Sequence, residues 1–428
     1  MGIQCSFALD IEYSLSEIQK NWNLFLLKYP YCIDYETTES IELKDNEIYS
    51  INLQEKYQCK TISEYLDEII KENSFEVAKT RCFGMKKSSL LTTSIINLNN
   101  KKYTLFSMYH CHSKTDFKSI VYFVEEFLSF FDESNSIEMK VIPIQSEYSK
   151  LLELNCLPSI EKRNQIEKEI QRDILTFNIL SLLNKSKFIS IENQQKAKEE
   201  IKEIIPNCFI SQTLKLSKEE TKKLIHYAKQ FELSIEAVLL SVMLKSYCEC
   251  FDINDSNMKT ISFMIPFDVR KLFGFDEHCI GIFGEGIYPS YPSSFLDLSI
   301  NEMSKQLTDY IRSITSFDSN TFDRFRDVIY CGNSSLGNIP YTLSLSNMGR
   351  FKVMERVSSS LKQHIVDFHL SGCNRFPCTR QMNSMMIHSY LLFDGTCNLS
   401  LSYAYSIIPS IIPEIVLNKM YSLLTSLN

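Results

Sequence analysis

The chain has 428 residues, of which 44% are hydrophobic and 12% aromatic, so it can bury a large core, and its length favours two domains or lobes. The formal net charge is −7, with Lys and Arg scattered among the acids. Such a charge pattern offers no basic face for nucleic-acid phosphates. We therefore expect a globular protein that does not bind nucleic acid.

The 14 cysteines lack the short chain and the regular framework of secreted disulfide scaffolds. We interpret them as reduced thiols that pack as small hydrophobic groups. No apolar run approaches the length of a membrane span, and the first residues lack the basic and apolar regions of a secretion signal. These features predict a cytoplasmic protein.

The first residues also fit a lipidation signal. Met1 to Ser6 match the short N-myristoylation pattern at Gly2, and Cys5 would supply a second acyl anchor. Such lipidation would give the protein a peripheral contact with a membrane. The alternative is a first strand, Ile3–Leu9, and we favour it because no polybasic patch follows.

Residues 1–157 are expected to form a first lobe in which helices and strands alternate. Two helices of about four turns each begin at a capping box, in which a Ser or Thr is followed three residues later by Glu. These pairs are Ser14 with Glu17 and Thr61 with Glu64. A hairpin follows, because period-two patterns flank two asparagines, which tolerate left-handed backbone. Its strands and turn are Ser89–Leu98, Lys102–His110 and Asn99-Asn100.

Asp116 is predicted to start the next helix, whose apolar positions recur every three or four residues as far as Phe131. His112 lies four residues before Asp116, so both belong to the turn between a strand and this helix. Such a turn can hold an imidazole at the mouth of a cleft and anchor a carboxylate in the scaffold. His112 and Asp116 are therefore the leading candidates for a functional site.

Residues 158–206 are rich in Lys, Glu and Gln and are interpreted as a charged connector that is partly helical. Residues 207–428 are then expected to form a second lobe. This lobe opens with a capping box at Ser217 and Glu220 and continues with an apolar helix, Ile235–Tyr247.

The rest of the second lobe is predicted to be mainly strands. They are Thr260–Ile265, Ile280–Tyr288, Tyr341–Ser346, His364–Leu370, Met385–Phe393 and Cys397–Tyr405. Asp394-Gly395 is a strong hairpin turn signal. Pro413 suits the first turn of a final helix, Glu414–Leu427. Each lobe is thus predicted to be a mixed α/β layer.

Four segments stand out in chain order. They are Cys111-His112-Ser113-Lys114-Thr115-Asp116-Phe117, Ile265-Pro266-Phe267-Asp268-Val269-Arg270, Ser344-Leu345-Ser346-Asn347-Met348-Gly349, and the Asp394-Gly395 hairpin with its terminal helix. In this order they resemble the chloramphenicol-acetyltransferase-like acyltransferases, which include condensation domains and alcohol acetyltransferases, and the first segment is similar to the catalytic box of that family. The resemblance covers most of the chain and implies two α/β lobes side by side, with the active site at their interface.

The resemblance implies transfer of an acyl group, here expected to be acetyl, from a coenzyme A thioester to a hydroxyl or amine of a small molecule or lipid. It implies a monomer without a tightly bound cofactor. His112 would be the general base, since an imidazole with a pKa of about 6.5 is neutral before it takes a proton. Asp116 would form a structural ion pair with Arg270 and also suits a helix N-cap. Candidates for the oxyanion or the substrate channel are Ser346, Asn347 and Gly349.

Two residues depart from the family pattern. Phe117 stands where a glycine usually follows the catalytic Asp, and Cys111 stands where a second His usually precedes the catalytic one. A phenyl group in place of glycine would narrow the channel or displace the loop. The alternative is therefore a catalytically silent protein of the same fold that binds a ligand or a partner. A third hypothesis is a condensation or ester-forming enzyme whose donor arrives on a carrier protein of another chain.

Other patterns carry weaker hypotheses. His110 and His112 share a strand face, but no further ligands stand at metal-site spacing, and we expect no metal. The glycines of Gly281–Gly286 have the wrong spacing for a dinucleotide loop and are expected to mark a bulge or a close backbone approach. Gly332–Gly337 lacks the spacing of a serine-hydrolase elbow.

Overall fold

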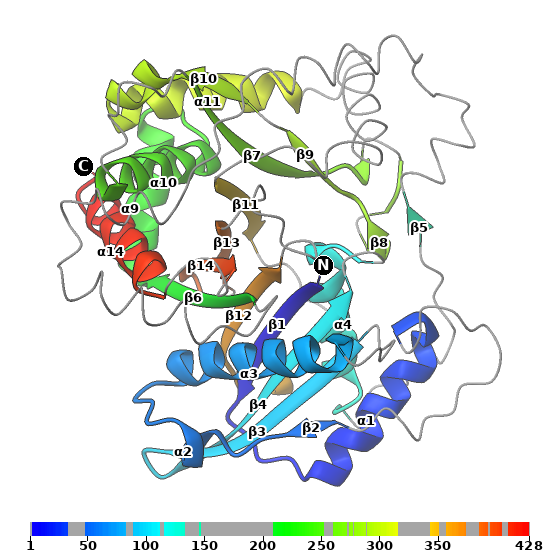
Figure 1. The fold of residues 1–428 in the computed structure, drawn as a ribbon. Helices are drawn as coiled ribbons and strands as arrows, with labels where there is room; N and C mark the ends of the chain where they lie inside the picture. Colours follow the sequence, from blue (N-terminus) through cyan, green and yellow to red (C-terminus); the bar gives the residue numbers. More distant parts are fainter. Residues whose placement is uncertain are drawn as a thin grey trace.

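In the computed structural model of the chain, the placed helices and strands form two mixed sheets, each with helices against it (Figure 1). The residues that the structure describes are 2–32, 48–82, 89–111, 115–132, 145–146, 209–251, 260–271, 274–276, 278–287, 289–315, 343–350, 357–373, 385–392, 394–404 and 410–427. The expected connector, 158–206, lies outside them.

The first sheet has the strand order β12-β1-β4-β3-β2. β12, β1, β4 and β3 are antiparallel neighbours, and β2 runs parallel to β3. The bounds are β1 Gly2–Leu9, β2 Tyr49–Ser50, β3 Ser89–Leu98, β4 Lys101–Cys111 and β12 Ile365–Cys373. One edge strand, β12, thus comes from the predicted second lobe. The predicted hairpin is confirmed, with left-handed φ angles of 53° at Asn99 and 61° at Asn100.

Helices cover both faces of the first sheet. α1 (Leu15–Lys28) and α4 (Phe117–Ser129) pack on the face that carries Phe7 and Phe106. α3 (Ile62–Cys82) and the short α2 (Leu53–Lys56) pack on the opposite face. The capping box at the start of α1 is confirmed. α3 has 21 residues and is therefore longer than the four turns predicted.

The second sheet has the order β10-β7-β11-β13-β14-β6, with β9 paired to β7. Its bounds are β6 Phe209–Leu216, β7 Thr260–Asp268, β9 Gly284–Ile287, β10 Ser290–Pro292, β11 Leu343–Arg350, β13 Met385–Leu391 and β14 Cys397–Ala404. A two-stranded sheet joins β5 (Gln145–Ser146) to β8 (Gly281–Ile282). The predicted β13–β14 hairpin is confirmed, and Gly395 adopts a φ of 88° at its turn.

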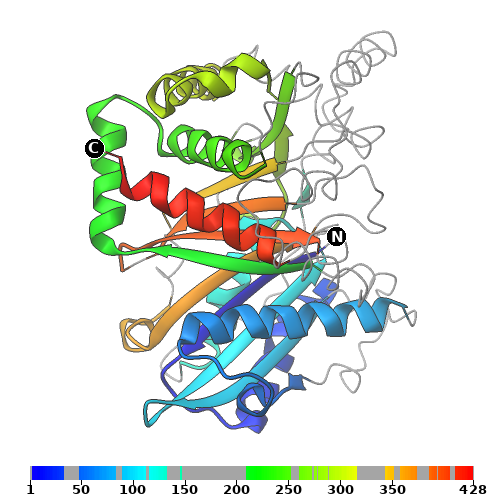
Figure 2. The same ribbon diagram turned by 60° about the vertical axis from the view of Figure 1, so that its left-hand side comes forward.

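Four long helices lie along one face of the second sheet, where the larger core of the molecule is found (Figure 2). They are α9 (Lys218–Gln230), α10 (Ile235–Phe251), α11 (Ile300–Ile314) and α14 (Ile411–Thr425). Shorter helical turns are η1 (Pro30–Cys32), η5 (Ser293–Asp297) and α13 (Ser359–Lys362).

The two faces of the second sheet differ sharply in chemistry. Adjacent strands place Leu345, Ile387 and Leu401 in one row, which packs under the helices. The neighbouring row, one residue along each strand, is Ser346, His388, Ser400 and Thr213. Because side chains alternate along a strand, this polar row faces the other way. That face adjoins the first sheet, since the hydroxyl of Ser402 on the same face accepts a hydrogen bond from the backbone N–H of Gly372 in β12.

The structure also shows where the sequence patterns were incomplete. Helix α11 was not predicted, although Ser299 and Glu302 form a full capping box at its start. The single strand expected at Ile280–Tyr288 is divided into β8 and β9 at Phe283. The last helix begins three residues before the predicted start, with Pro413 in its first turn as expected.

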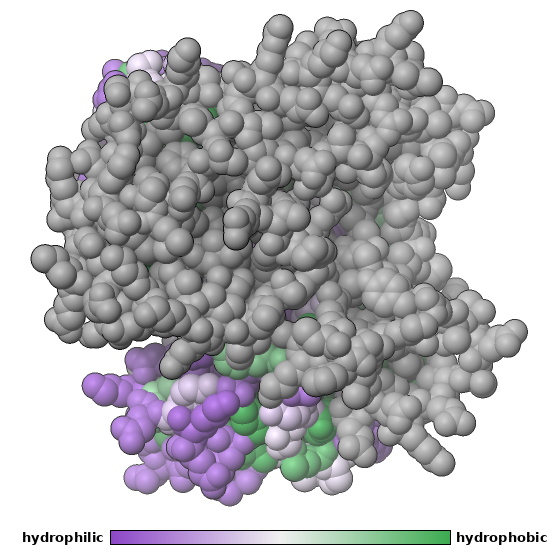
Figure 3. Space-filling model, in the orientation of Figure 1, coloured by the Kyte–Doolittle hydropathy of each residue, from purple (hydrophilic) through white to green (hydrophobic). Residues whose placement is uncertain are grey.

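Among the described residues, no helix is both long and apolar enough to cross a bilayer. Figure 3 shows that the coloured surface at the end of the molecule formed by the first sheet is largely hydrophilic, with a smaller hydrophobic area beside it. The large apolar side chains that are exposed lie on separate elements or far apart on one helix: Leu15, Leu27, Phe231, Val366 and Tyr421.

Candidate functional site

The candidate site lies where β4 ends and α4 begins. Cys111 closes β4 opposite Gly2 of β1, and Asp116 is the N-cap of α4, with its carboxylate accepting a 2.8 Å hydrogen bond from the backbone N–H of Ser119. Thr115 and Asp116 are both buried. His112 and the two residues after it lie outside the described residues.

Asp116 also forms the ion pair that the sequence predicted. Arg270 contacts both carboxylate oxygens, with Nη1 at 2.9 Å from Oδ2 and Nη2 at 2.9 Å from Oδ1. The side chains are 1% and 7% exposed. Such a two-point contact fixes orientation as well as charge. Arg270 follows β7 of the second sheet, so the pair joins the start of α4 to the second half of the chain.

The other donors of the Arg270 guanidinium are also engaged. Nη1 donates to Asp268 Oδ1 at 3.0 Å, Nη2 to Ser119 Oγ at 3.0 Å, and Nε to the carbonyl oxygen of Cys279 at 2.9 Å. The guanidinium carbon lies 4.5 Å from the centre of the Phe283 ring, within the range of a cation–π contact. These partners leave the arginine little freedom to turn away from Asp116.

A glycine-rich segment completes the surroundings of the carboxylate. The backbone N–H of Phe283 donates to Asp116 Oδ2 at 3.0 Å, and the backbone N–H of Asp116 donates to the carbonyl of Gly281 at 2.9 Å. Ser119 Oγ accepts from the N–H of Gly281 at 3.1 Å. The sequence predicted a bulge or a close backbone approach in this segment, and the structure shows the close approach. It did not identify Ser119, Gly281 and Phe283 as partners of Asp116, and the run of glycines was the available signal.

The hydrogen bonds and the neighbouring charge determine the ionisation of Asp116. Burial by itself raises a carboxyl pKa, because the charged form loses its hydration. The charge and the hydrogen bonds of Arg270, together with the donors of Ser119, outweigh burial and hold the pKa of Asp116 below its ordinary value. The carboxylate is therefore ionised and occupied, which suits a structural group better than a proton acceptor.

The second-lobe candidates divide between the two faces of β11. Ser346 lies beside His388 on the polar face, and it is 6% exposed. Asn347 points to the opposite side, where its side-chain oxygen accepts from Ser389 Oγ at 3.1 Å and from the backbone N–H of Gly349 at 3.0 Å. Gly349 has a φ of 65°, which favours glycine. Ser346 is thus the candidate on the face toward the first sheet, while Asn347 holds the irregular end of β11 at Gly349.

Phe117 replaces the expected glycine without disturbing the cap of α4, since Asp116 still binds Ser119. Its ring is 8% exposed and lies 4.0 Å from the ring of His388, measured between centres. A methyl group at Gly372 would lie 2.6 Å from Phe117 Cζ and 2.7 Å from His388 Nε2. The glycine that makes room for Phe117 is therefore in β12, far away in the sequence.

His110 is a structural residue. Its ring packs against Phe25 and Phe123, and its Nδ1 lies 2.6 Å from Ser89 Oγ. Burial lowers the pKa of His110 to about 3, so the ring is neutral. In the part of the chain that the structure describes, no three His, Cys, Asp or Glu side chains gather as a metal site would require.

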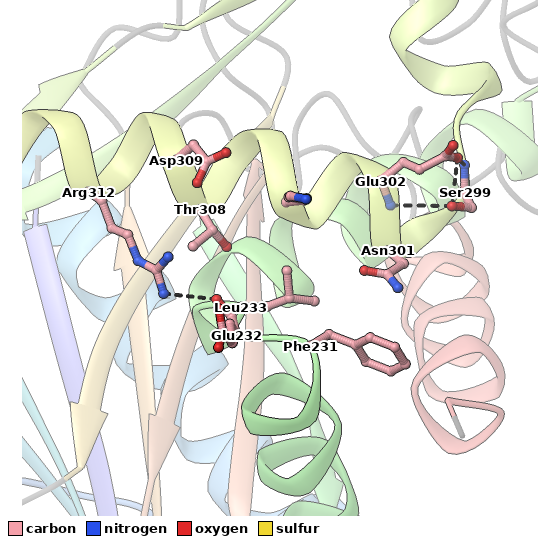
Figure 4. A pocket seen from close by; sticks show the side chains of 10 residues that line it. Phe231, Glu232, Leu233, Ser299, Asn301, Glu302, Thr308, Asp309 and Arg312 are labelled. Carbon is pink, nitrogen blue, oxygen red and sulfur yellow. Dashed lines mark hydrogen bonds between the residues drawn. The ribbon is translucent and has the colours of Figure 1, made fainter.

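A cavity of about 620 Å³ lies elsewhere, between the turn Phe231–Leu233 and α11 (Figure 4). Arg312 Nη2 donates to the backbone oxygen of Glu232 at 2.8 Å across it. Charged side chains of both signs line it, among them Lys305 and Asp309. It belongs to the helical layer of the second sheet, on the side away from His388.

Comparison with solved structures shows what this fold is shared with. The chain has a TM-score of 0.65 and 10% identity to the TRI3 trichothecene 15-O-acetyltransferase of Fusarium sporotrichioides, covering 100% of this chain and 91% of that one. Polyketide synthase associated protein 5 of Mycobacterium tuberculosis gives 0.63 at 12% identity, covering 99% and 94%. The epimerization domain of tyrocidine synthetase B gives 0.60 at 12%, covering 100% and 90%.

The chain has the two-lobed fold of condensation domains and chloramphenicol-acetyltransferase-like proteins. The expected fold class and the resemblance to this superfamily are therefore confirmed at the level of fold. No protein-family model matches the chain, and no curated protein matches it by sequence. Identities of 10–12% mean that the activity has to be argued from the residues.

The ion pair gives a first prediction. Arg270→Met should lower the free energy of unfolding by about 3–5 kcal/mol, because it leaves the buried Asp116 carboxylate without its counter-charge. Since the pKa of Asp116 is depressed in the folded protein, the wild-type pair stabilises above the unfolded pKa of about 3.9 and loses this effect in acid. The difference in free energy of unfolding between the wild type and Arg270→Met, measured by urea denaturation, should therefore become smaller below about pH 4.

A matched control is Lys118→Met, which breaks the 2.8 Å pair with Asp268. Both partners are about one-third exposed, so the loss should stay below about 1 kcal/mol. Equal losses in the two variants would contradict the structural role of Arg270.

The contact between Phe117 and Gly372 gives a second prediction. Gly372→Ala should cost about 1–3 kcal/mol, because the added methyl group meets two packed rings that cannot both withdraw. Gly284→Ala is the control, since its methyl group would lie 3.8 Å from the nearest atom, Asp116 Cβ. Denaturation of the double variant Phe117→Leu/Gly372→Ala tests the contact directly. If the double variant loses as much free energy of unfolding as the two single variants lose together, the contact is contradicted.

Proposed function

We propose that the protein is an acyltransferase that moves an acyl group, acetyl in the simplest case, from coenzyme A to a hydroxyl or amine. The observation that carries the proposal is the buried pair of Asp116 and Arg270. It fixes the end of the segment that contains His112, in a fold that includes a known O-acetyltransferase. An arginine from the second half of the chain meets that segment at the boundary of the two lobes.

His112 is the proposed general base. An alcohol is a weak nucleophile at neutral pH, so a base must take its proton as its oxygen attacks the thioester carbonyl. The carbonyl oxygen becomes an oxyanion in the tetrahedral intermediate. When this collapses, the carbon–sulfur bond breaks, and the imidazolium returns the proton to the leaving thiolate of coenzyme A. Acid–base catalysis of this kind supplies roughly a hundred- to ten-thousand-fold in rate.

Asp116 and Arg270 are positioning residues in this proposal. The carboxylate accepts from Arg270, from Ser119 and from the backbone of Phe283, so its lone pairs are committed to the scaffold. It holds the start of α4 against the glycine-rich segment and thereby the chain end that leads to His112. Ser346, on the face toward the first sheet, is the proposed polar contact for the oxyanion or the thioester arm.

A second candidate function is ligand binding without turnover. Phe117 favours it, because its ring occupies buried space against His388, next to Asp116. In that case coenzyme A or an acceptor would bind and raise the melting temperature, but no thiol would be released. A donor on a carrier protein is a further variant of the proposed reaction and would show turnover with an acylated carrier but not with acetyl-CoA.

His112→Ala tests the proposed base. Thiol release from acetyl-CoA, measured with a panel of alcohols and amines, should fall by roughly a hundred- to ten-thousand-fold. The variant should keep the wild-type melting temperature within a few degrees.

His226→Ala is the matched control, since His226 is exposed on α9 of the second lobe. It should retain full activity. An active His112→Ala variant would exclude His112 as the base. A wild-type protein that releases no thiol with either donor, and that coenzyme A does not stabilise, would exclude the proposed function as a whole.

A further inference from the structure

A group of partly buried polar and charged side chains surrounds His369 in the middle of β12. The ring is fully buried. Nδ1 lies 2.8 Å from Asp67 Oδ1 and 3.2 Å from Thr213 Oγ1. Nε2 lies 3.0 Å from Ser63 Oγ and 3.8 Å from Asp367 Oδ2. Both ring nitrogens therefore face a carboxylate, and we refer to these five residues and Lys215 as the junction cluster.

The junction cluster joins the two sheets. α3 covers the first sheet, β12 is its edge strand, and β6 is the edge strand of the second sheet, which lies alongside α3 in both ribbon views (Figures 1 and 2). The backbone N–H of Thr213 in β6 donates to Asp67 Oδ2 of α3 at 3.2 Å. Lys215 Nζ lies 3.0 Å from Asp367 Oδ1. The same charged groups thus hold a helix of one lobe against a strand of the other.

The charges of this cluster balance only when the imidazole is protonated. Burial acts to lower the pKa of His369, but the carboxylates of Asp67 and Asp367 outweigh it and raise the pKa to about 9. Asp67 and Asp367 contribute two negative charges, and Lys215 with the imidazolium contributes two positive ones. A neutral ring would leave one negative charge uncompensated beside the buried ring, in a group whose Asp67 and Lys215 side chains are 24% and 34% exposed, which lowers stability.

We propose that His369 is a charged connection between the two lobes, which holds α3 against β6 while its ring is protonated and loosens when the ring loses its proton. Three elements supply its partners, and two ion pairs and the hydrogen bond from Thr213 to Asp67 cross or border the junction. This inference is independent of the proposed acyl transfer.

The arrangement also resembles a hydrolase triad, because the ring of His369 lies between Ser63 and Asp67. The geometry argues against that role. A triad histidine must be neutral to take the proton of the serine. Here Asp367 faces the same ring nitrogen as Ser63, which keeps a proton on that nitrogen. The imidazolium donates to the serine, and the serine hydroxyl is not activated.

The neighbours on the remaining strands do not compete for the proton. Ser6 of β1 pairs with His369 in the sheet, and Ser400 of β14 lies 3.3 Å from Thr213 Oγ1. Burial raises the pKa of Tyr390 in β13 well above its ordinary value, and the negative charges of Asp67 and Asp367 raise it further. The tyrosine therefore stays neutral. Among the described neighbours of the junction cluster, His369 is therefore the group that changes charge between neutral and moderately alkaline pH.

The sign of the effect follows from the raised pKa. Stabilisation by His369 is complete below its unfolded pKa of about 6.5 and is lost as the pH rises through about 9. His369→Gln, which has no charge to lose, should melt several degrees below the wild type at pH 7. The difference in melting temperature, measured by calorimetry on the full chain, should shrink as the pH approaches 10.

His364→Gln is the matched control. His364 stands just before β12 and its Nδ1 lies 2.6 Å from Asp10 Oδ1, but its side chain is 36% exposed and the pair stays within the first sheet. This variant should melt close to the wild type. Hydrogen exchange at pH 7 locates the effect, because His369→Gln should speed exchange in β6 and α3 and leave the β3–β4 hairpin unchanged.

A second variant tests the charge balance when His369→Gln does not fold. Asp67→Asn keeps the shape of the side chain and removes one carboxylate, so the alkaline loss of stability should move toward neutral pH. Unchanged pH dependence in Asp67→Asn would overturn the proposal. A difference in melting temperature between the wild type and His369→Gln that is the same at pH 7 and pH 10 would also overturn it.

Discussion

The buried carboxylate of Asp116 is the interaction on which the candidate site depends. It caps α4, pairs with Arg270 through both carboxylate oxygens and accepts a hydrogen bond from the backbone N–H of Phe283. The start of α4 therefore meets Arg270 and Phe283, both more than a hundred residues later in the chain, at one charge. Both the carboxylate and the guanidinium are buried and hydrogen-bonded. Removal of either group would therefore leave the other as an unpaired charge in the interior, which is strongly destabilising.

A polar row on the second sheet links this site to the other buried charge centre. Ser346, His388, Ser400 and Thr213 lie side by side across four strands. Phe117 contacts this row at His388, and Thr213, at the other end of the row, is also a member of the junction cluster. The hydrogen bonds of Thr213 at one end of the row, and the contact between the Phe117 and His388 rings near the other, give the two sheets a defined relative position.

Much of the local structure was predictable because it depends on short-range chemistry. The capping boxes of α1 and α9, the Asn99-Asn100 turn and the β13–β14 hairpin follow from residues within a few positions of each other. Helix α11 carries the same signal, a capping box of Ser299 and Glu302. The division of β8 from β9 was not predictable, because Phe283 leaves the strand pattern to donate its N–H to a carboxylate far away in the sequence.

The sequence by itself determined the order of elements, since periodicity, caps and turn residues encode it locally. The pair of Asp116 with Arg270 and the two-lobed fold were implied by the resemblance of a few spaced motifs to a known superfamily. Only the tertiary structure decided that β12 completes the first sheet, that Ser346 and Asn347 face opposite ways, that Gly372 accommodates Phe117, and that His369 stands between two carboxylates. These facts depend on contacts between residues far apart in the chain, and such contacts leave no pattern in a single sequence.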